Sequence, residues 1–384
     1  MADLTPRARR ILLALGGLYA VVNVSIGVHS GGDFVFHLRL AERLLQAQPL
    51  YGDFNGSIGL PWPPFAIVAL APFALLARLS LPLAKAVWAV GNVALFGWCL
   101  VRGYHHVGRW TPVVLAVAAV AQPLQSNFQH LNINLVLLAL VVLAIADLEQ
   151  GREVRAALWI GVATALKGYP GAIFLYFLVR GRWRPLVAGV TAAVGLTFLV
   201  MVPAGFAGAA NVSDYVHLAL TAQSTQALAG QSIGGLVARL GGNVATAVIL
   251  DLLAVAAVAA VLWRGRATSE PTYEVGMTAV LAVLLAPLDR LHYYVLALPA
   301  WTDLFSRPAP ARGWRRTAWL GVLGVAALLT SGMLSHISSA LPTVLRVIRQ
   351  NTYNFGAIIL LIVLVARRAV LSRPPQPSPA SRPT

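Results

Sequence analysis

Charged residues are scarce in this sequence. Only 11% of its 384 residues are Asp, Glu, Lys or Arg, whereas 58% are hydrophobic and the mean hydropathy is +0.74. A soluble domain carries roughly 25% charged residues, so this chain has too little polar surface to coat a water-soluble globule. Apolar runs long enough to cross a bilayer recur instead, each needing about 20 residues. The composition predicts an all-α fold, a polytopic bundle of transmembrane helices, because a helix satisfies its own backbone hydrogen bonds in hydrocarbon.

The sequence also lacks several common chemical signatures. Its single cysteine, Cys99, excludes an intrachain disulfide. It contains no Walker loop, no G-x-G-x-x-G after a strand and no G-x-S-x-G. The eight histidines show no metal-ligand spacing. We therefore predict no protein-built metal site and no certain cofactor. Whether a divalent cation accompanies the substrate stays open.

Acidic residues are few, and the formal net charge is +16. The Lys and Arg residues do not gather on one soluble module but punctuate the apolar segments, which is the positive-inside pattern. We therefore predict no nucleic-acid partner. Arg7, Arg9 and Arg10 precede the first apolar run, and no A-x-A-like cleavage site follows it, so this run is predicted to be an uncleaved first helix. The chain is thus expected in a bacterial cytoplasmic membrane, multi-pass, with both termini cytoplasmic and membrane lipids around it.

Arginine clusters close the inward ends of the apolar runs from residue 132 onward, and about 12 membrane crossings result. Residues 64–131 hold three apolar runs, near 65–79, 86–101 and 112–124, where two crossings are needed. One of these runs is therefore predicted to be short or re-entrant. We treat residues 1–370 as one transmembrane domain with large outer loops at 29–63 and 203–242. Residues 371–384 are Pro/Ser-rich and are predicted to form a disordered cytoplasmic tail.

The first outer loop contains an amphipathic segment. In VFHLRLAERLLQAQ, Phe36, Leu40 and Leu44 share one helical face, and charged residues occupy most of the other. This pattern favours a helix that lies in the membrane interface. A helix that caps the bundle would show the same pattern, and both interpretations can hold together.

Polar residues from distant segments map to one membrane edge. The predicted topology places seven of them at the outer side: Asp33, Asn132, Lys167, Gln231, Asp289, Arg290 and His292. Charged groups at membrane depth cost at least about 2.5–3.5 kcal/mol, so such a set suggests one outward-facing polar cavity. The simpler explanation is that loop ends are always polar. Lys167 argues against it, because it lies inside an apolar run and the chain has only one other lysine, Lys85.

Six short stretches occur in the same order as in a known family. GGDFVFHLRLAERLLQAQPLYGDF, with Asp33, precedes LPWPPF; then come LNINLVLL, GVATALKGYP, GQSIGGLVARL and APLDRLHYY. Together they resemble bacterial polyprenyl-phosphate-mannose-dependent α-mannosyltransferases of the C-type glycosyltransferase superfamily (GT-C), which include phosphatidylinositol-mannoside mannosyltransferases of actinobacteria. The match covers roughly residues 30–305. Asp289, Arg290 and Tyr293 depart from the family pattern, which has a second histidine where this chain has Tyr293.

The resemblance implies an inverting transfer of a sugar, mannose in the first place, from a polyprenyl-phosphate donor to a lipid or glycan acceptor at the outer face. Lipid phosphate is a good leaving group, so one general base and cations suffice, whereas a glycosidase generally pairs two carboxylates. Asp33 would be the base, with Asp53 as a weaker rival. The implied donor-phosphate ligands are Lys167, His292, Arg290, Arg346 and Arg349. The implied sugar or acceptor contacts are Asn134, Asn132, Gln231, Asp53 and Tyr51.

Two other functions remain open at this point. The same fold could use a polyprenyl-phosphate arabinose or glucose donor. A membrane transporter or lipid flippase is the second alternative, and Asp251, which lies within an apolar run, is the residue that favours it. An intramembrane acid can serve a proton relay, but a plain interhelical hydrogen bond explains Asp251 as well. No clear repeat relates the two halves of the chain, which argues against a transporter.

Overall fold

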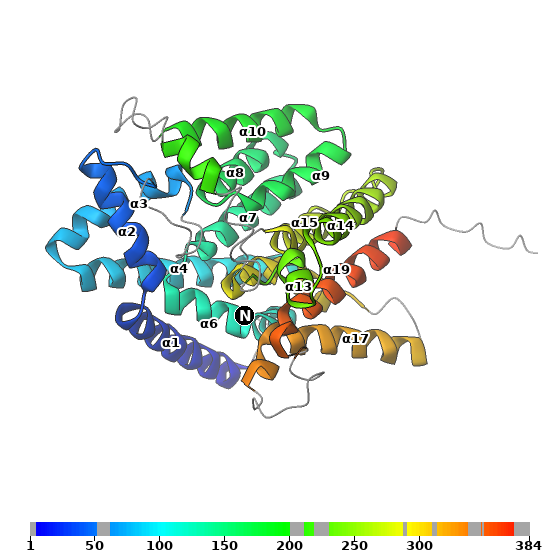
Figure 1. Cartoon of the computed structure of the whole chain (residues 1–384). Coiled ribbons are helices and arrows are strands. Elements are labelled where there is room, and N and C mark those ends of the chain that lie inside the picture. The colour runs from blue at the N-terminus through cyan, green and yellow to red at the C-terminus, as the bar shows by residue number, and fades with distance from the viewer. Residues whose placement is uncertain are drawn as a thin grey trace, which may run out of the picture.

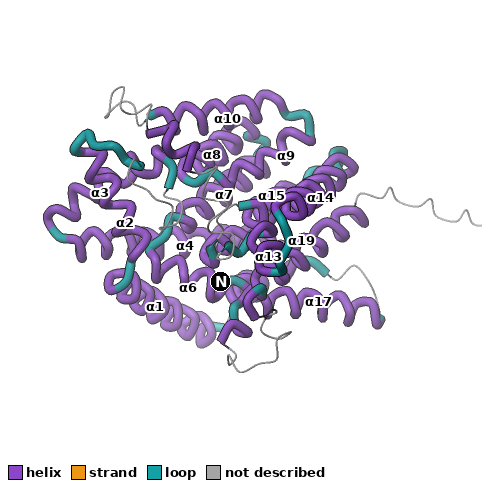
Figure 2. Tube along the Cα trace, viewed as in Figure 1, coloured by secondary structure: helices purple, strands orange, loops and turns teal. Residues whose placement is uncertain are grey.

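The computed structural model describes residues 5–51, 62–199, 211–218, 230–286, 290–308, 313–336, 347 and 349–371. Every regular element within these ranges is a helix, which confirms the all-α prediction (Figure 1, Figure 2). The helices are α1 (Pro6–His29), α2 (Gly32–Leu45), α3 (Pro64–Leu79), α4 (Leu81–Val107), α5 (Trp110–Ala119), α6 (Ala121–His130), α7 (Asn134–Glu149), α8 (Glu153–Leu166), η1 (Tyr169–Ile173), α9 (Phe174–Val179), α10 (Trp183–Phe198), α13 (Ile233–Arg239), α14 (Val244–Arg264), α15 (Pro271–Leu285), η3 (Leu291–Ala297), α16 (Leu298–Ser306), α17 (Trp314–Ser331), η4 (Met333–His336) and α19 (Thr352–Leu371).

Several of these helices are suited to a bilayer. Among the described residues, α4, α14 and α19 are each long and apolar enough to cross one. Leu13–His29 and Gly32–Leu45 would form a fourth such segment if they were counted as one span, but they meet at a bend of 52°. Shorter apolar helices include α3, α5, α10, α15 and the η1–α9 pair. A helical membrane protein is therefore confirmed, whereas the number of crossings remains a prediction.

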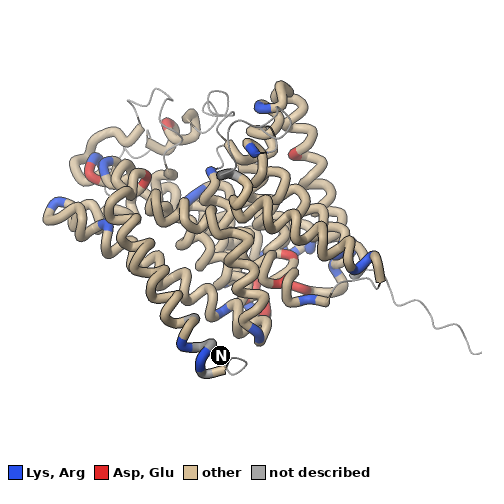
Figure 3. Tube along the Cα trace, turned by 90° about the horizontal axis from the view of Figure 1, so that it is seen from below, with Lys and Arg blue, Asp and Glu red and all other residues tan. Residues whose placement is uncertain are grey.

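The charges separate along the bundle. Figure 3 shows Lys, Arg, Asp and Glu concentrated toward two opposite sides, one of which carries the chain's N-terminus, with a mostly uncharged band between. The 27-residue α4 connects the two sides, and its length is about 40 Å at 1.5 Å per residue. Near its start, the Lys85 ammonium donates to the carbonyls of Val28 and Ser30 at the end of α1. Near its end, His106 pairs with Glu149 at the end of α7.

The third helix folds back on the second. Just before α3, the Trp62 N–H donates to His37 of α2 over 3.0 Å, and in its last turn Arg78 pairs with Glu42 of α2 at 2.7 Å. Midway, the Phe73 ring meets Phe34 edge to face. Because both ends of α3 contact the same short helix, α3 does not run to the opposite side of the bundle. Which run within 64–131 does not cross the membrane remains a prediction, and these contacts favour α3.

The amphipathic pattern of the first outer loop is confirmed as a helix, α2. Its Leu40 and Leu44 side chains are each 3% exposed, as the pattern requires, whereas Arg39 is exposed. Phe34, at the start of the same helix, stacks on Trp88 of α4 with ring centroids 5.1 Å apart. The apolar face of α2 is thus covered by α3 and α4, as expected for a helix that caps the bundle.

Four interruptions between consecutive helices lie together at one end of the bundle. They fall between α1 and α2, α6 and α7, α8 and η1, and α15 and η3. Gly31 and Leu131 make two of these breaks in the left-handed region, with φ of 56° and 50°. Glycine adopts this conformation without strain, and the Gly31 N–H donates to Gln129 beside the second break. Backbone that leaves the helix at membrane depth must be buried in protein or line a cavity.

A buried ion cluster fixes the other end of α15. Glu274 is fully buried and accepts from Arg180 at 2.8 Å and from Arg368 at 2.6 Å. Arg368 also donates to the carbonyls of Gly265 and Thr268, so one guanidinium joins α19 to the loop before α15. Removal of one partner from such a group leaves an uncompensated buried charge.

We expect Glu274→Gln to lower the free energy of unfolding by about 3–5 kcal/mol, because two buried guanidinium groups lose their carboxylate. Glu153→Gln is the matched control, since Glu153 pairs with Arg182 at an exposed position and at 3.4 Å. Its loss should cost no more than about 1 kcal/mol. Unfolding of the purified protein in detergent measures both. Equal losses for the two variants would contradict a structural role for the Glu274 cluster.

Candidate functional site

The break after α8 presents a buried lysine. Lys167 follows Leu166, the last residue of the helix, in an extended conformation with φ −162° and ψ 109°. Gly168 and Pro170 follow, and proline cannot continue the helical hydrogen-bond ladder. Lys167 is only 6% exposed. The helix thus ends at a point where the ammonium group of Lys167 must find partners inside the protein.

Two asparagines and a tyrosine supply those partners. The Lys167 ammonium donates to Asn132 Oδ1 at 3.0 Å and to Asn134 Oδ1 at 3.2 Å. It also lies 3.7 Å from the ring centroid of Tyr293, a cation–π contact. Oxygen acceptors and an aromatic face offset the cost of burying the charge.

Asn132 connects the lysine to an acid. Its Nδ2 donates to Asp33 Oδ2 at 2.7 Å while its Oδ1 accepts from Lys167. This amide can satisfy both neighbours in one orientation only, because the carboxylate needs a donor and the ammonium an acceptor. Asp33 keeps 35% of its side chain exposed, and no described residue donates to its Oδ1. One primary amide therefore separates an accessible carboxylate from a buried cation.

His292 lies on the other side of Asp33. Its Nε2 is 3.8 Å from Asp33 Oδ2, and its Nδ1 is 3.4 Å from the Ser126 hydroxyl of α6. Asn134 Nδ2 donates to the His292 carbonyl at 3.2 Å and so holds the start of η3. His292 is thus held between Ser126, Asn134 and the carboxylate of Asp33.

His37 fixes the helix that carries Asp33. Its Nε2 accepts from the Trp62 N–H, so its Nδ1 carries the proton and donates to the Asp33 carbonyl at 2.6 Å. The His37 and Trp62 rings also stack, with centroids 3.9 Å apart. Sequence reasoning missed His37, although its position four residues after Asp33 on a helix puts both on one face.

Two tyrosines support Lys167 and were also missed. The Tyr169 and Tyr293 rings stack with centroids 4.7 Å apart, and the Tyr169 hydroxyl donates to Asn134 Oδ1 at 3.1 Å. The signal in the sequence was the Tyr293 position, where the resembled family has histidine. In this chain that position supplies a π face to the lysine.

The structure brings together five of the predicted site residues: Asp33, Asn132, Asn134, Lys167 and His292. Gln231 lies nearby, and its backbone carbonyl accepts from Tyr294 at 2.5 Å, but its side-chain Oε1 has no hydrogen-bond partner among the described residues. Tyr51 is 2% exposed and donates to the Trp62 carbonyl, so it supports the first outer loop.

The remaining predicted residues are only partly described. Arg290 is exposed two residues before His292, and Arg349 precedes α19. Asp53, Arg346 and Asp289 lie outside the described residues. Within the described part of the chain, no group of three or more His, Cys, Asp or Glu residues could hold a metal ion.

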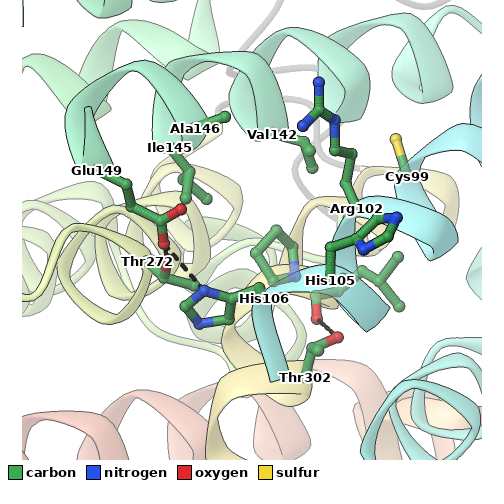
Figure 4. Close-up of a pocket in the computed structure, with 13 residues that line it drawn as sticks. Cys99, Arg102, His105, His106, Val142, Ile145, Ala146, Glu149, Thr272 and Thr302 are labelled. Carbon is green, nitrogen blue, oxygen red and sulfur yellow. Dashed lines mark hydrogen bonds and ion pairs between the residues drawn. The ribbon is translucent and has the colours of Figure 1, made fainter. Parts of the chain in front are cut away.

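A second cavity, of about 190 Å³, lies at the far end of α4 (Figure 4). His106 lines it and pairs with Glu149 at 2.9 Å and with Asp303 at 3.6 Å. Thr272 donates to the same Glu149 carboxylate at 2.6 Å. These contacts join the ends of α4, α7, α15 and α16, so the charges in this cavity already neutralise one another and serve packing.

Asp251, which favoured a transporter, lies on the peripheral helix α14. Its Oδ1 has no hydrogen-bond partner among the described residues. Asp251 is far along the chain from the cluster around Lys167, and no described contact links the two. The interhelical hydrogen bond that the simpler explanation expected is not found within the described residues.

The fold is that of a helical membrane protein with a cluster of polar side chains at one end of its bundle. The family model of glycosyltransferase family 87 matches residues 61–288, and the chain belongs to that family. The matched range includes Asn132, Asn134 and Lys167, whereas Asp33 and His292 lie just outside it. The expected family likeness and the class of enzyme are confirmed.

Similar proteins carry consistent names. The chain is 31% identical to a polyprenol-phosphate-mannose-dependent alpha-(1-2)-phosphatidylinositol mannoside mannosyltransferase of Mycolicibacterium smegmatis, over 74% of this chain and 71% of that protein. It is 29% identical to a protein of the same description from Mycobacterium tuberculosis, over 74% and 72%. A pentamannoside mannosyltransferase of Mycolicibacterium smegmatis is 25% identical, over 83% and 78%.

We expect Tyr293→Leu to raise the KM for the sugar donor about three- to thirtyfold, because the ammonium of Lys167 loses its aromatic face. Tyr293→Phe keeps that face and should restore most of the loss. Steady-state kinetics with the donor varied at saturating acceptor measure this. If Phe and Leu impaired the enzyme equally, the ring would not be what holds Lys167.

Proposed function

We propose that the protein transfers mannose from a polyprenyl-phosphate donor to a lipid or glycan acceptor at the outer face of the membrane, with inversion at the anomeric carbon. The observation that carries this proposal is the pair of hydrogen bonds that Asn132 makes with Asp33 and Lys167. They hold a carboxylate and an ammonium group apart by the width of one amide. Such spacing suits a sugar whose anomeric carbon lies between an acceptor hydroxyl and a departing phosphate. The names of the relatives support this donor.

Asp33 acts as the general base. Its Oδ1, which has no described donor, takes the proton of the acceptor hydroxyl while Asn132 holds Oδ2. The acceptor oxygen then forms a bond to the anomeric carbon as the bond from that carbon to the phosphate oxygen breaks. The electron pair of the broken bond leaves with the polyprenyl phosphate. A phosphate needs no acid to protonate it, so one carboxylate suffices, and the single displacement inverts the anomeric carbon.

Lys167 receives the departing phosphate. Two amide oxygens and a tyrosine ring hold its ammonium in the cluster beside Asp33, where a lipid-linked phosphate can meet it. A preorganised cation in a water-poor site stabilises charge that develops in the transition state. His292 is assigned to Asp33 and not to the phosphate, because its Nε2 faces the carboxylate. There it orients the base.

The topology supports an outward-facing site. With α3 folded back on α2, twelve crossings remain: α1, α4, α5–α6, α7, α8, η1–α9, α10, α14, α15, η3–α16, α17 and α19. An even number leaves both termini on one side, and the arginines before α1 assign that side to the cytoplasm. Asp33 follows α1 by four residues and therefore faces outside. The donor's phosphate then lies at the membrane edge, where a lipid-linked sugar presents it.

A glycolipid acceptor fits the same position. The relatives are named for phosphatidylinositol mannoside, and a headgroup at the outer membrane edge reaches Asp33 without leaving the bilayer. Asp33 is also 35% exposed, which leaves a hydroxyl access to it.

We expect Asp33→Asn to lower kcat for sugar transfer by about 10²- to 10⁴-fold, because the acceptor hydroxyl loses its base. Donor binding should stay nearly unchanged, since asparagine has the same size and Asp33 does not face the phosphate. Asp53→Asn is the control, as the other acid of the first outer loop. Transfer from a radiolabelled polyprenyl-phosphate mannose measures both. A fully active Asp33→Asn protein, or an inactive Asp53→Asn protein beside it, would remove the assignment.

We expect Lys167→Ala to raise the donor KM about ten- to a hundredfold while the acceptor KM changes little, because a charged hydrogen bond to phosphate is lost. Lys85→Ala is the matched control, as the only other lysine. Lys85 donates to backbone carbonyls at the α1–α4 contact, so its loss should affect thermal stability and not the ratio of the two KM values. Equal effects of Lys167→Ala on both KM values would contradict the phosphate role.

A further inference from the structure

Three amide side chains gather where the bundle should be apolar. A hollow of about 350 Å³ lies between α1, α6 and the end of α17, and Asn23, Gln122 and Gln125 line it. The outer surface of α1 beside it is typical of contact with lipid, since Leu18 and Val21 are 61% and 69% exposed. Amides at membrane depth need hydrogen-bond partners, so three in one hollow call for a polar occupant.

Two of the amides are fixed by the protein. Asn23 is 3% exposed and its Nδ2 donates to the Tyr19 carbonyl at 2.8 Å, but its Oδ1 has no hydrogen-bond partner among the described residues. Gln122 accepts from the Tyr353 hydroxyl and lies against Gly332, where any Cβ would collide with it. Gln125 is exposed and so remains available in the hollow.

The hollow adjoins the reaction centre through α6. Gln125 precedes Ser126, whose hydroxyl is 3.4 Å from His292 Nδ1 on the other side of the helix. Toward the outer end the gap closes, because a Cβ on Gly27 of α1 would lie 2.5 Å from the Leu131 side chain. At 1.5 Å per residue, Gln122 and Gln125 lie about 6–12 Å along α6 from its outer end. A lipid in the hollow would thus lie just below its own headgroup at Asp33.

We infer that this hollow binds the glycerol ester region of the acceptor, a glycerolipid whose sugar headgroup reaches Asp33. This inference rests on the proposed function and narrows its acceptor. None of the described residues that line the hollow is charged, so they offer no charge partner to a phosphate. An isoprenoid chain has no hydrogen-bonding groups to match the amides. Ester carbonyls match the exposed amide, with Gln125 Nε2 as donor.

Photolabelling in nanodiscs tests the occupant without sugar transfer. One probe is a phosphatidylinositol with a diazirine at the start of an acyl chain, and the other is a polyprenyl phosphate with a diazirine in its first isoprene unit. We expect the first probe to label peptides of α1 and α6 that line the hollow, and Gln125→Leu to lower that labelling at least threefold. Equal labelling by the polyprenyl probe would overturn the inference, as would labelling that Gln125→Leu leaves unchanged.

Kinetics give a second test with a matched control. Gln125→Leu should raise the acceptor KM about three- to tenfold, the loss of one hydrogen bond, and leave the donor KM unchanged. Asn23→Leu changes the wall of the same hollow and should also leave the donor KM unchanged. Asn92→Leu on α4 is the control, because Asn92 is equally buried, also donates to the carbonyl four residues earlier and also has an Oδ1 without a described partner, yet lies outside the hollow.

The outcomes separate the inference from the proposed function. A rise in donor KM, or an equal effect of Asn92→Leu, would overturn the inference while sugar transfer itself persists. A wild-type protein that labels with phosphatidylinositol as expected but transfers no sugar would remove the proposed function instead. Gln125 is exposed, so Gln125→Leu remains informative even if Asn23→Leu fails to fold.

Discussion

The burial of one positive charge organises the reaction centre. Lys167 is 6% exposed, and a lone ammonium at that depth is stable only if its surroundings supply acceptors. The chain provides two asparagine oxygens and a tyrosine ring, all neutral. Asn132, which accepts from the lysine, donates in turn to Asp33. The compensation that makes the lysine stable also holds the carboxylate in place.

This arrangement depends on broken helices. Continuous helices would present side chains from their outer surfaces, whereas Gly31, Leu131 and Lys167 each leave the helical conformation at the same end of the bundle. Side chains from α2, the α6–α7 connection and η3 can then converge on one point. The backbone groups freed at the breaks are satisfied locally, as where Gly31 donates to Gln129 and Asn134 to the His292 carbonyl.

Much of this was predictable from the sequence, for identifiable reasons. Hydropathy predicted helices, because runs such as that of α14 leave no alternative in a bilayer. Topology placed Asp33, Asn132, Lys167 and His292 at one edge, because parity and arginine clusters order the crossings without any knowledge of contacts. That these side chains converge on one point was a hypothesis from topology alone, and the hydrogen bonds that link Asp33, Asn132 and Lys167 support it.

Other features could not be predicted because they depend on packing. The fold-back of α3 follows from Trp62 and Arg78 contacting α2, and nothing in its apolar composition separates it from a crossing helix. The role of Tyr293 follows from the position of a lysine 126 residues earlier in the chain. The amide-lined hollow joins residues of α1, α6 and α17 that no motif connects.

The central claim is that Asp33 and Lys167 act on opposite sides of one sugar. The most direct measurement is a structure of the Asp33→Asn protein with polyprenyl-phosphate mannose bound. The account predicts the phosphate within hydrogen-bond distance of Lys167 Nζ and the anomeric carbon between it and residue 33. A phosphate bound away from Lys167, or a sugar that turns its anomeric carbon away from residue 33, would contradict it.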